Sequence, residues 1–221
     1  MILRRAVLFD EVIWAWLASE WTYTVRKVPG ADRRLIDAAN FRSAKENAAR
    51  RALLDVRRGN LLDALPATTA WSLVQLQRKD IPLLSILPSF DWYLDTGGTF
   101  RLLDTRTHLC SGHGYVDEHG TRQPILHEEH VRDILRKRTA RPADWAAEPI
   151  VIVAATTGGP WTIIDGTHRA SAYLRTAMDA PLAAYRGYSR LMRRYGWHIE
   201  SAGARKRIAR ARRYIAKGEV W

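Results

Sequence analysis

The chain has 221 residues, of which 47% are hydrophobic, 26% charged and 10% aromatic, a composition that fits one globular domain or two small ones with a real core. Nine tryptophans and eight tyrosines argue against a disordered chain, and no apolar run of about 18 residues is present that would span a bilayer. The N-terminal residues lack the pattern of a secretory signal, and the single cysteine cannot form an internal disulfide. We therefore expect a cytoplasmic protein.

The net charge of +12 is concentrated at the C-terminal end. Residues 186–221 contain eleven lysines and arginines against two glutamates, a balance of +9, whereas the preceding 185 residues carry only +3. A nearly neutral body with a cationic end favours a polyanionic partner.

Helices are predicted for much of the N-terminal region. Apolar residues recur at helical spacing within residues 1–22, and a clearer helix is expected over about 43–58, where Ser43 and Glu46 form a capping box. Residues 61–78 could hold a further short helix. The arginines on the outer side of this region are expected to face solvent rather than a ligand.

The pattern changes near residue 83 to that of extended segments. Residues 91–103 contain two extended runs on either side of Gly97 and Gly98, which is typical of a β-hairpin. The stretch 107–120 is rich in glycine and histidine and is expected to form a loop or a second hairpin. A helix is predicted to follow at about 126–138.

Residues 149–187 show the clearest order of elements. The β-branched run at 150–155 predicts a buried strand, and a second strand is expected at 161–164. A tight junction at Asp165 opens a helix, after which 182–185 can return as a third strand. This order predicts an α/β fold with a small mixed sheet.

The junction Asp165-Gly166-Thr167-His168-Arg169 is the motif with the clearest chemistry. The first amides of a helix lack intrahelical partners and the helix dipole places partial positive charge there, so the junction is a potential anion site. Arg169 could grip a phosphate with two hydrogen bonds, and His168 could donate a hydrogen bond or relay a proton. Asp165 could bind a metal, act as a base or merely cap the helix. An ordinary capping turn with surface His and Arg is the alternative interpretation.

The passage EPIVIVAATTGGPWTIIDGTHRASAYLRTAMDAPLAAY, with the preceding helix HEEHVRDILRKR, resembles the ParB/sulfiredoxin superfamily. That family pairs a Pro-Ile-x-Val strand with a Gly-x-His-Arg or Gly-Glu-Arg-Arg turn, an alanine-rich helix and a strand introduced by proline. The resemblance covers about residues 124–187. It implies a small α/β fold whose turn, here Gly166 to Arg169, holds nucleotide phosphates, often with magnesium.

Departures from the family narrow what the resemblance implies. Thr167 stands where sulfiredoxins carry a nucleophilic cysteine, which argues against sulfinic-acid reduction. Partition ParB proteins have two arginines where this chain has His168 and Arg169, and they continue into a long helix-turn-helix region for which the 34 residues after Gly187 are too few. The Asp-Gly-x-His-Arg spelling looks more like enzymatic members. These include nucleotide-dependent kinases of small molecules and plasmid fertility-inhibition proteins of the Osa/FiwA type, credited with ATPase or DNase activity.

Three glutamates could complete the site that the resemblance implies. Glu148 directly precedes the strand at 150, where acids can face the phosphate turn in this fold, and Glu128 and Glu129 lie on the preceding helix. The predicted catalytic residues are His168, Asp165, Glu129 and Glu148. Asp165 with Glu128 could hold Mg²⁺, and ATP is the second possible cofactor. A helix-surface or strand-edge charge is the alternative role for each glutamate.

Two histidine patterns argue against a zinc site. His108, Cys110, His113 and His119 match no standard zinc spacing, so loop histidines with a buried thiol are the preferred interpretation. The histidines of HEEH at 127–130 are three residues apart rather than the four of HExxH.

Residues 203–217 predict an amphipathic helix with a narrow apolar seam and a cationic remainder. Such a helix suits sequence-independent contact with phosphate backbones. The predicted DNA contacts are Arg205, Lys206, Arg207, Arg210, Arg212 and Arg213. An anionic membrane surface, an acidic protein partner and a merely solvated helix are the alternatives.

The sequence thus predicts a helical region and hairpin at 1–105, a ParB/sulfiredoxin-like catalytic core at 106–190 and a basic helix at 191–221. The expected function is a nucleotide- or metal-dependent DNase with possible ATPase activity, acting in a bacterial cytoplasm as a plasmid-encoded inhibitor of conjugative transfer. DNA and a conjugation or secretion-system protein are the expected partners. The alternatives are a small-molecule kinase, and a non-catalytic protein of the same fold that binds nucleotide or DNA or inhibits a secretion ATPase.

Overall fold

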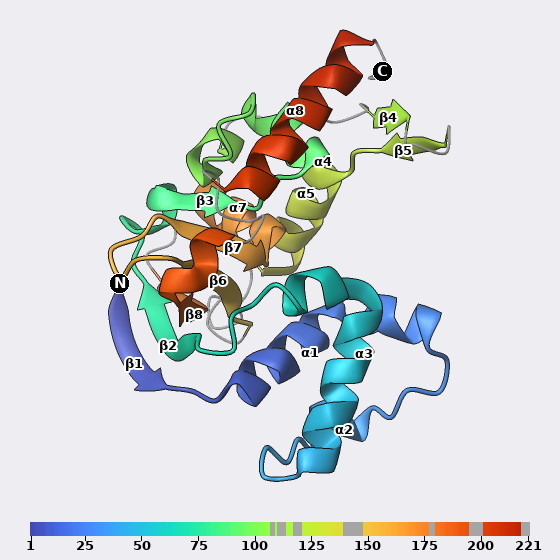
Figure 1. Cartoon of the computed structure of the whole chain (residues 1–221), viewed down its shortest axis with the longest axis vertical. Helices are drawn as coiled ribbons and strands as arrows, with labels where there is room; N and C mark the ends of the chain where they lie inside the picture. The colour runs from blue at the N-terminus through green and yellow to red at the C-terminus, as the bar shows by residue number, and fades with distance from the viewer. Residues whose placement is uncertain are drawn as a thin grey trace.

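The computed structural model describes residues 1–106, 109, 114–116, 121–138, 148–176, 180–194 and 201–217. They form a mixed α/β structure in which helices cover both faces of a six-stranded sheet (Figure 1), so the predicted α/β class is confirmed. The strands run across the sheet in the order β1 (Ile2–Ala6), β2 (Ala70–Leu76), β8 (Leu182–Tyr188), β6 (Ile150–Ala154), β7 (Trp161–Asp165) and β3 (Leu84–Ile86).

The strand β6 lies in the interior of the sheet and is buried on both sides. It pairs in parallel with β8 and antiparallel with β7. Because side chains alternate across a strand, Ile150 and Ile152 enter one core while Val151 and Val153 enter the other. An uninterrupted apolar run is the pattern of a strand covered on both faces, which is why this strand was predictable from sequence.

One face of the sheet is covered by α1 (Phe9–Lys27), α3 (Ala44–Leu62) and the short α2 (Arg34–Asp37), which lie together in the lower part of Figure 1. Trp16 and Leu54 are fully buried in this core. The side chain of Ser43 accepts a hydrogen bond from the amide of Glu46, so the predicted N-cap of α3 is confirmed. The helix continues beyond the predicted end at residue 58.

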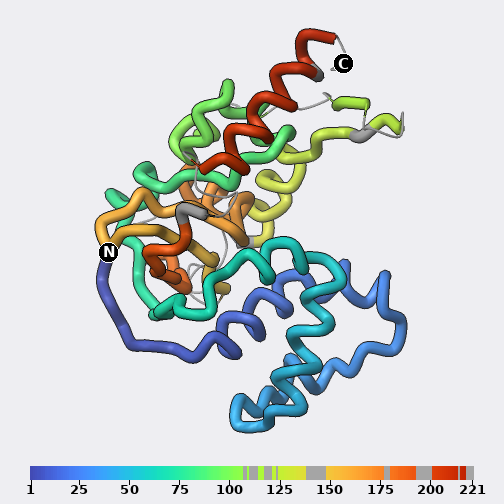
Figure 2. Tube along the Cα trace, in the orientation of Figure 1, coloured from blue at the N-terminus to red at the C-terminus, as the bar shows by residue number. Residues whose placement is uncertain are grey.

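The other face carries α4 (Phe90–Thr96), α5 (His127–Arg138), α7 (Thr167–Arg175) and α8 (Ala202–Ala216). The strands β4 (Gly114–Val116) and β5 (Arg122–Pro124) pair as a separate two-stranded sheet. Figure 2 follows the chain from the N-terminus beside the sheet to α8, which packs on α4 and leads away from the sheet.

Three sequence predictions for the first 105 residues are wrong. Residues 2–6 form the edge strand β1 before the first helix begins, and the helix expected within 61–78 is the strand β2, which pairs along its length with β8. The hairpin expected at 91–103 is instead the helix α4 followed by a 3₁₀ turn at Leu102–Thr105. Gly97 adopts φ 60° as the residue that ends α4, so the Gly-Gly pair marks a helix end and not a hairpin turn.

The elements predicted from 126 onward are confirmed. The helix α5, the strands β6, β7 and β8, the helix α7 and the basic helix α8 all lie where the sequence indicated, with ends that differ by a few residues at most. The sheet takes strands from both sides of the boundary expected at 105/106, since β1, β2 and β3 precede it. In the described ranges, no helix has the length and apolar character needed to cross a bilayer.

Candidate active site

The turn from β7 into α7 is built around Gly166. Its φ of +86° belongs to the left-handed region, which favours glycine. A Cβ placed there would also lie 2.6 Å from Cγ2 of Ile150 and 2.9 Å from Nη2 of Arg169. Both backbone conformation and space therefore require glycine at this position.

The first turn of α7 presents unpaired amides. No side chain caps this helix, and the first amide bonded back into the turn is that of Ala170, which donates to the carbonyl of Gly166 at 2.9 Å. Within the described part of the chain, the amides of Thr167, His168 and Arg169 have no acceptor. These groups, with the positive end of the helix dipole, could bind an anion.

Arg169 is held by carboxylates rather than presented to a ligand. Its Nη2 donates to Oδ2 of Asp165 at 2.6 Å, and its Nη1 donates to the carbonyl of Glu148 at 3.3 Å and lies 3.7 Å from that residue's carboxylate. The side chain is only 10% exposed. In this structure its guanidinium joins the end of β7 to the residues just before β6, and phosphate binding by Arg169 stays a prediction.

The Asp165 carboxylate is also bound by neighbouring side chains. In addition to Arg169, it accepts a hydrogen bond from Oγ of Ser19 on α1 at 3.1 Å. Burial raises the pKa of Asp165, with the nearby Arg169 opposing that effect. The carboxylate thus links α1, β7 and α7, and the prediction that it binds metal or acts as a base does not fit its surroundings.

Glu128, the second predicted metal ligand, lies in a different ion-pair cluster. Its carboxylate accepts from Arg175 at 2.8 Å and from Arg132 at 2.9 Å. Although burial raises its pKa, the hydrogen bonds from these arginines outweigh burial and lower it. Of the residues that the structure describes, no three His, Cys, Asp or Glu side chains are grouped to hold a metal ion. The predicted Mg²⁺ site of Asp165 and Glu128 therefore does not fit this arrangement.

The other two predicted glutamates lie at the surface. The side chain of Glu148 is 59% exposed beside Arg169, and Glu129 is exposed on α5. Neither carboxylate is within hydrogen-bonding distance of His168 in the described structure. Thr167 follows Gly166 as the first residue of α7 and is half-buried.

His168 is instead linked to two residues that were not predicted from the sequence. Its Nε2 lies 2.9 Å from Nδ1 of His127, at the start of α5. Nε2 of His127 lies 3.2 Å from Oδ2 of Asp91, in the first turn of α4. Asp91, His127 and His168, hereafter the relay, bring together the N-terminal turns of three helices. This hydrogen-bonded chain is the most distinctive arrangement of titratable groups among the described residues.

Aromatic and histidine rings surround the relay. The ring of Trp92 lies 3.8 Å from that of His127 and 5.2 Å from that of His168, measured between centroids. His130, one helical turn after His127 and exposed, has its ring 5.0 Å from that of His168 in an edge arrangement. Trp92 therefore holds the two relay histidines in place, while His130 stands at their open side.

The protonation of the relay follows from its surroundings. Burial, with the nearby His127 and His130, lowers the pKa of His168 to about 3, so that its ring is neutral at neutral pH. Burial raises the pKa of Asp91, but hydrogen bonds from His127, Ser89 and the Trp92 amide outweigh it and bring the value to about 2. Asp91 is thus a carboxylate, which can only accept hydrogen bonds.

The Asp91 carboxylate determines the tautomer of His127, and His127 in turn determines the tautomer of His168. We assign His127 the tautomer that donates from Nε2 to Asp91, in which its Nδ1 accepts the proton of Nε2 of His168. This leaves Nδ1 of His168 as an unprotonated lone pair. Among the described residues that atom has no hydrogen-bond partner, and His168 as a whole is half-buried. The relay therefore offers a bare imidazole nitrogen to a ligand, in the same helical turn as three unpaired amides.

A dependence of stability on pH follows from the lowered pKa of His168. Unfolded His168 takes up a proton near its ordinary pKa of about 6.5, whereas the folded ring stays neutral down to about 3. Above pH 6.5 the ring is neutral in both the folded and the unfolded state, so its pKa shift does not affect the free energy of unfolding. As the pH falls, only the unfolded state takes up the proton, and the free energy of unfolding is lower by about 2 kcal/mol at pH 5. Urea unfolding at pH 7, 6 and 5 should show this loss in the wild type and a flatter profile in His168→Gln. Parallel profiles for the two proteins would contradict a ring that stays neutral in the folded state.

The basic helix α8 packs beside the relay. It contacts α4, the helix that carries Asp91, and its residues Ala204 and Ala211 are buried while Ile208 packs on the core. Arg207 is half-buried and donates to the carbonyl of Pro88 at 3.4 Å, two residues before α4. The predicted apolar seam is therefore confirmed except at its end, where Ile215 is 42% exposed.

The predicted DNA contacts on α8 differ in their surroundings. Arg207 anchors the helix, so its predicted outward position is corrected. The remaining five are exposed, namely Arg205, Lys206, Arg210, Arg212 and Arg213. The loose cluster of His108, Cys110, His113 and His119 lies outside the described residues.

Two sequence signals point towards the relay. HEEH at 127–130 places two histidines three residues apart on one helix face, which indicates a histidine cluster even though the zinc spacing fails. Asp91 follows Ser89 and Phe90 at a helix start, but the hairpin interpretation of 91–103 separated it from any helix N-terminus.

Comparison with protein-family models, with curated proteins and with solved structures finds no match for this chain.

Proposed function

We propose that this protein is a DNA-acting phosphohydrolase whose reaction centre is the bare Nδ1 of His168. The observation that carries the proposal is the relay, because it presents an uncharged, unprotonated imidazole nitrogen beside three unpaired amides at a helix N-terminus. Phosphate oxygens are suited to such amides, and imidazole is the side chain most often used to move protons at neutral pH. The two features together favour phosphoryl chemistry.

Each group of the site would have a separate role in cleavage of a phosphodiester. The amides of Thr167, His168 and Arg169 would receive the non-bridging oxygens of a phosphodiester and stabilise the charge that grows on them during the reaction. His168 would act on the phosphorus or on the attacking water. His127 and Asp91 would hold the His168 ring in one tautomer and orientation, as the buried carboxylate does in a catalytic triad. Arg169 and Asp165 would shape the turn without touching the substrate.

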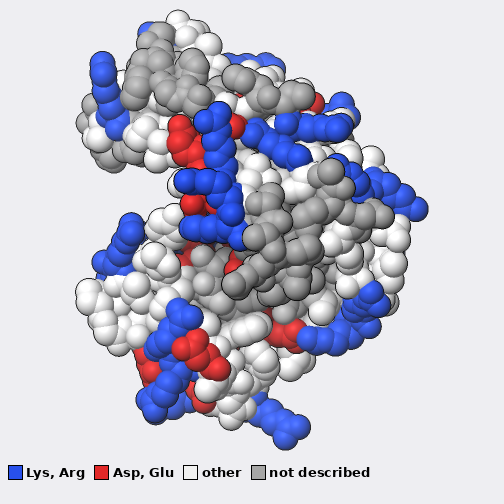
Figure 3. Space-filling model, turned by 180° about the vertical axis from the view of Figure 1, so that it is seen from behind, with Lys and Arg blue, Asp and Glu red and all other residues white. Residues whose placement is uncertain are grey.

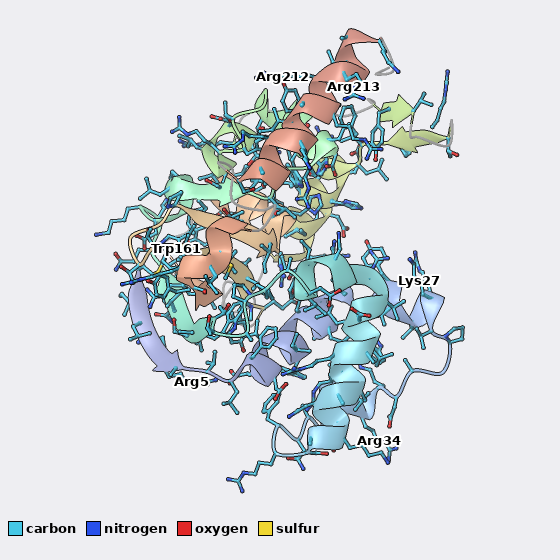
Figure 4. The ribbon with its side chains drawn as sticks, in the orientation of Figure 1. Arg5, Lys27, Arg34, Trp161, Arg212 and Arg213 are labelled. Carbon is cyan, nitrogen blue, oxygen red and sulfur yellow. The ribbon has the colours of Figure 1, made fainter. Side chains whose placement is uncertain are left out.

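The position of α8 supports a nucleic-acid substrate. It packs on α4 beside the relay and carries exposed basic residues, of which Arg212 and Arg213 project from its later turns (Figure 4). On the face opposite to that of Figure 1, basic side chains lie in separate groups, and those at the recess between the upper and lower parts stand beside acidic ones (Figure 3). We therefore assign backbone contact to α8, where the cations are concentrated.

The resemblance to the ParB/sulfiredoxin superfamily supports the same chemistry and suggests its setting. The Asp-Gly-x-His-Arg turn resembles the spelling of the plasmid fertility-inhibition proteins, so we propose a role in limiting conjugative DNA transfer, with ATP as a possible second ligand. The carboxylates predicted for Mg²⁺ are held by arginines, so the proposed reaction uses only side chains and backbone amides of this chain.

The direct test is nicking of supercoiled plasmid by the purified full-length protein, with and without excess EDTA, with ATP hydrolysis measured in parallel. We expect relaxed circles to appear in both conditions. Strong DNA binding with no nicking would instead support a non-catalytic binding protein. Nicking that disappears with EDTA would show that a metal ion is needed after all.

The contribution of α8 can be measured separately. Replacing Lys206, Arg212 and Arg213 together by glutamine should weaken binding of a DNA duplex and reduce the slope of log Kobs against log salt, because fewer counterions are released. The slope should fall by roughly one for each phosphate that the variant no longer neutralises. Replacing Lys27 and Arg34 by glutamine is the control, since both project from the opposite part of the molecule (Figure 4). Equal slopes for the α8 variant and the wild type would contradict the assignment.

A further inference from the structure

We propose that Nδ1 of His168 is the nucleophile of the reaction and forms a covalent phosphohistidine bond to the cleaved DNA strand. This rests on the proposed function and specifies how the same site works. A hydrolase of this kind can proceed either by direct attack of water on phosphorus, with histidine as a base, or by two displacements through the protein. The geometry of the relay favours the second route.

The position of the His168 ring allows direct attack. His168 is the second residue of α7, and helical side chains point back towards the N-terminus of their helix. The ring is therefore carried to the same end as the unpaired amides that would bind the phosphate. Nδ1 is not hydrogen-bonded within the described structure and the residue is half-buried rather than fully buried, which leaves this atom for attack on phosphorus.

The relay can also take up the charge that covalent attack creates. When Nδ1 of an imidazole bonds to phosphorus, the ring becomes cationic unless its other nitrogen loses a proton. Here Nε2 of His168 is 2.9 Å from Nδ1 of His127, which can take that proton. The resulting His127 imidazolium lies 3.2 Å from the Asp91 carboxylate, with a second carboxylate oxygen, on Asp95, at 3.9 Å. The relay thus has a place for the one proton that covalent attack displaces.

The reaction has two steps that balance in atoms and charge. In the first, Nδ1 of His168 bonds to phosphorus, the P–O bond to the leaving strand breaks, and the Nε2 proton of His168 moves to His127. The leaving oxygen takes a proton from His130, which must enter this step protonated and whose exposed ring lies 5.0 Å from that of His168. In the second, water attacks phosphorus and gives its proton to His130, the P–N bond breaks, and His127 returns its proton to His168. No external oxidant, reductant or metal takes part.

Four residues have separate roles in these steps. His168 and His130 are catalytic residues, since they touch the reacting atoms. His127 and Asp91 are positioning residues that set the tautomer and receive the proton. Asp91→Asn should therefore slow formation of the covalent species at least 10-fold while leaving DNA binding unchanged, since Asp91 is separated from His168 by the His127 ring.

One experiment uses stereochemistry at phosphorus. The full-length protein would cleave an oligonucleotide with a single phosphorothioate of known configuration in ¹⁸O-labelled water. Two displacements give overall retention of configuration, and one gives inversion. We expect retention. Cleavage with inversion would overturn the covalent nucleophile and leave the proposed hydrolase function standing, whereas no cleavage by the wild type would remove both.

A second experiment traps the intermediate. A reaction with a ³²P-labelled oligonucleotide, quenched in alkali at early times, should transfer label to the protein as a bond that survives alkali and is lost in mild acid, as expected of a phosphoramidate. Digestion and mass spectrometry should place it on the peptide containing His168. The adduct should be absent from His168→Gln and should form more slowly in His130→Gln, which lacks the group that protonates the leaving strand. Label on a serine, threonine or tyrosine would overturn the assignment.

Discussion

Replacing His168 by glutamine should reduce the rate of plasmid nicking by at least about 100-fold, the usual cost of removing a proton-transferring or nucleophilic imidazole. Glutamine is the informative substitution because its amide can still donate to Nδ1 of His127, so that His127 keeps its packing against Trp92. DNA affinity should change little, because the predicted backbone contacts lie on α8. Initial nicking rates at saturating protein, with binding measured on the same preparations, give the comparison.

Two further variants make this result specific to the relay. Asp91→Asn should give a smaller loss than His168→Gln, since it weakens the orientation of His127 without removing the reacting atom. Asp37→Asn on α2 is its matched control, because that carboxylate forms an exposed pair with Arg33 on the other side of the sheet. Full activity in His168→Gln would show that the reaction centre lies elsewhere.

Replacing Arg169 by methionine should lower the free energy of unfolding by about 3–5 kcal/mol. Methionine removes the charge but fills much of the same space, so that Asp165 is left buried with a hydrogen bond from Ser19 and without its ion-pair partner. Removing one member of a buried ion pair is costly chiefly because the other charge then has no counterion. Urea denaturation monitored by tryptophan fluorescence measures the change directly.

The control for this substitution is Arg34→Met, which breaks an exposed pair with Asp32 and should leave stability nearly unchanged. The double variant Arg169→Met/Asp165→Asn should recover part of the loss, because the amide no longer carries an uncompensated charge. If Arg169→Met were no more destabilising than Arg34→Met, the result would contradict a buried ion pair between Arg169 and the Asp165 carboxylate.

The part of the fold that was predictable consists of elements whose own residues specify them. The run at 150–155 is apolar at every position, which is the pattern of a strand covered on both faces. Ser43 and Glu46 indicate a helix start within four residues of sequence. The turn at Gly166 was likewise predictable, because a glycine between a strand and a helix indicates a backbone conformation with positive φ. These interactions act over a few residues, so the local sequence contains them.

The remainder was decided by pairing between distant segments. The strand β2 owes its extended form to β8, more than a hundred residues away, and α4 is a helix because it packs Trp92 into a core that its own sequence does not reveal. The functional arrangement is of the same kind. The sequence alone determined that a strand turns into a helix at residues 165–169 with a histidine in its first turn, and the structure showed that no side chain caps it. Only the tertiary structure decided which groups surround it, because Asp91, His127 and His168 become neighbours through the packing of three helices, and the arginine expected to hold phosphate is taken by the carboxylate four residues before it.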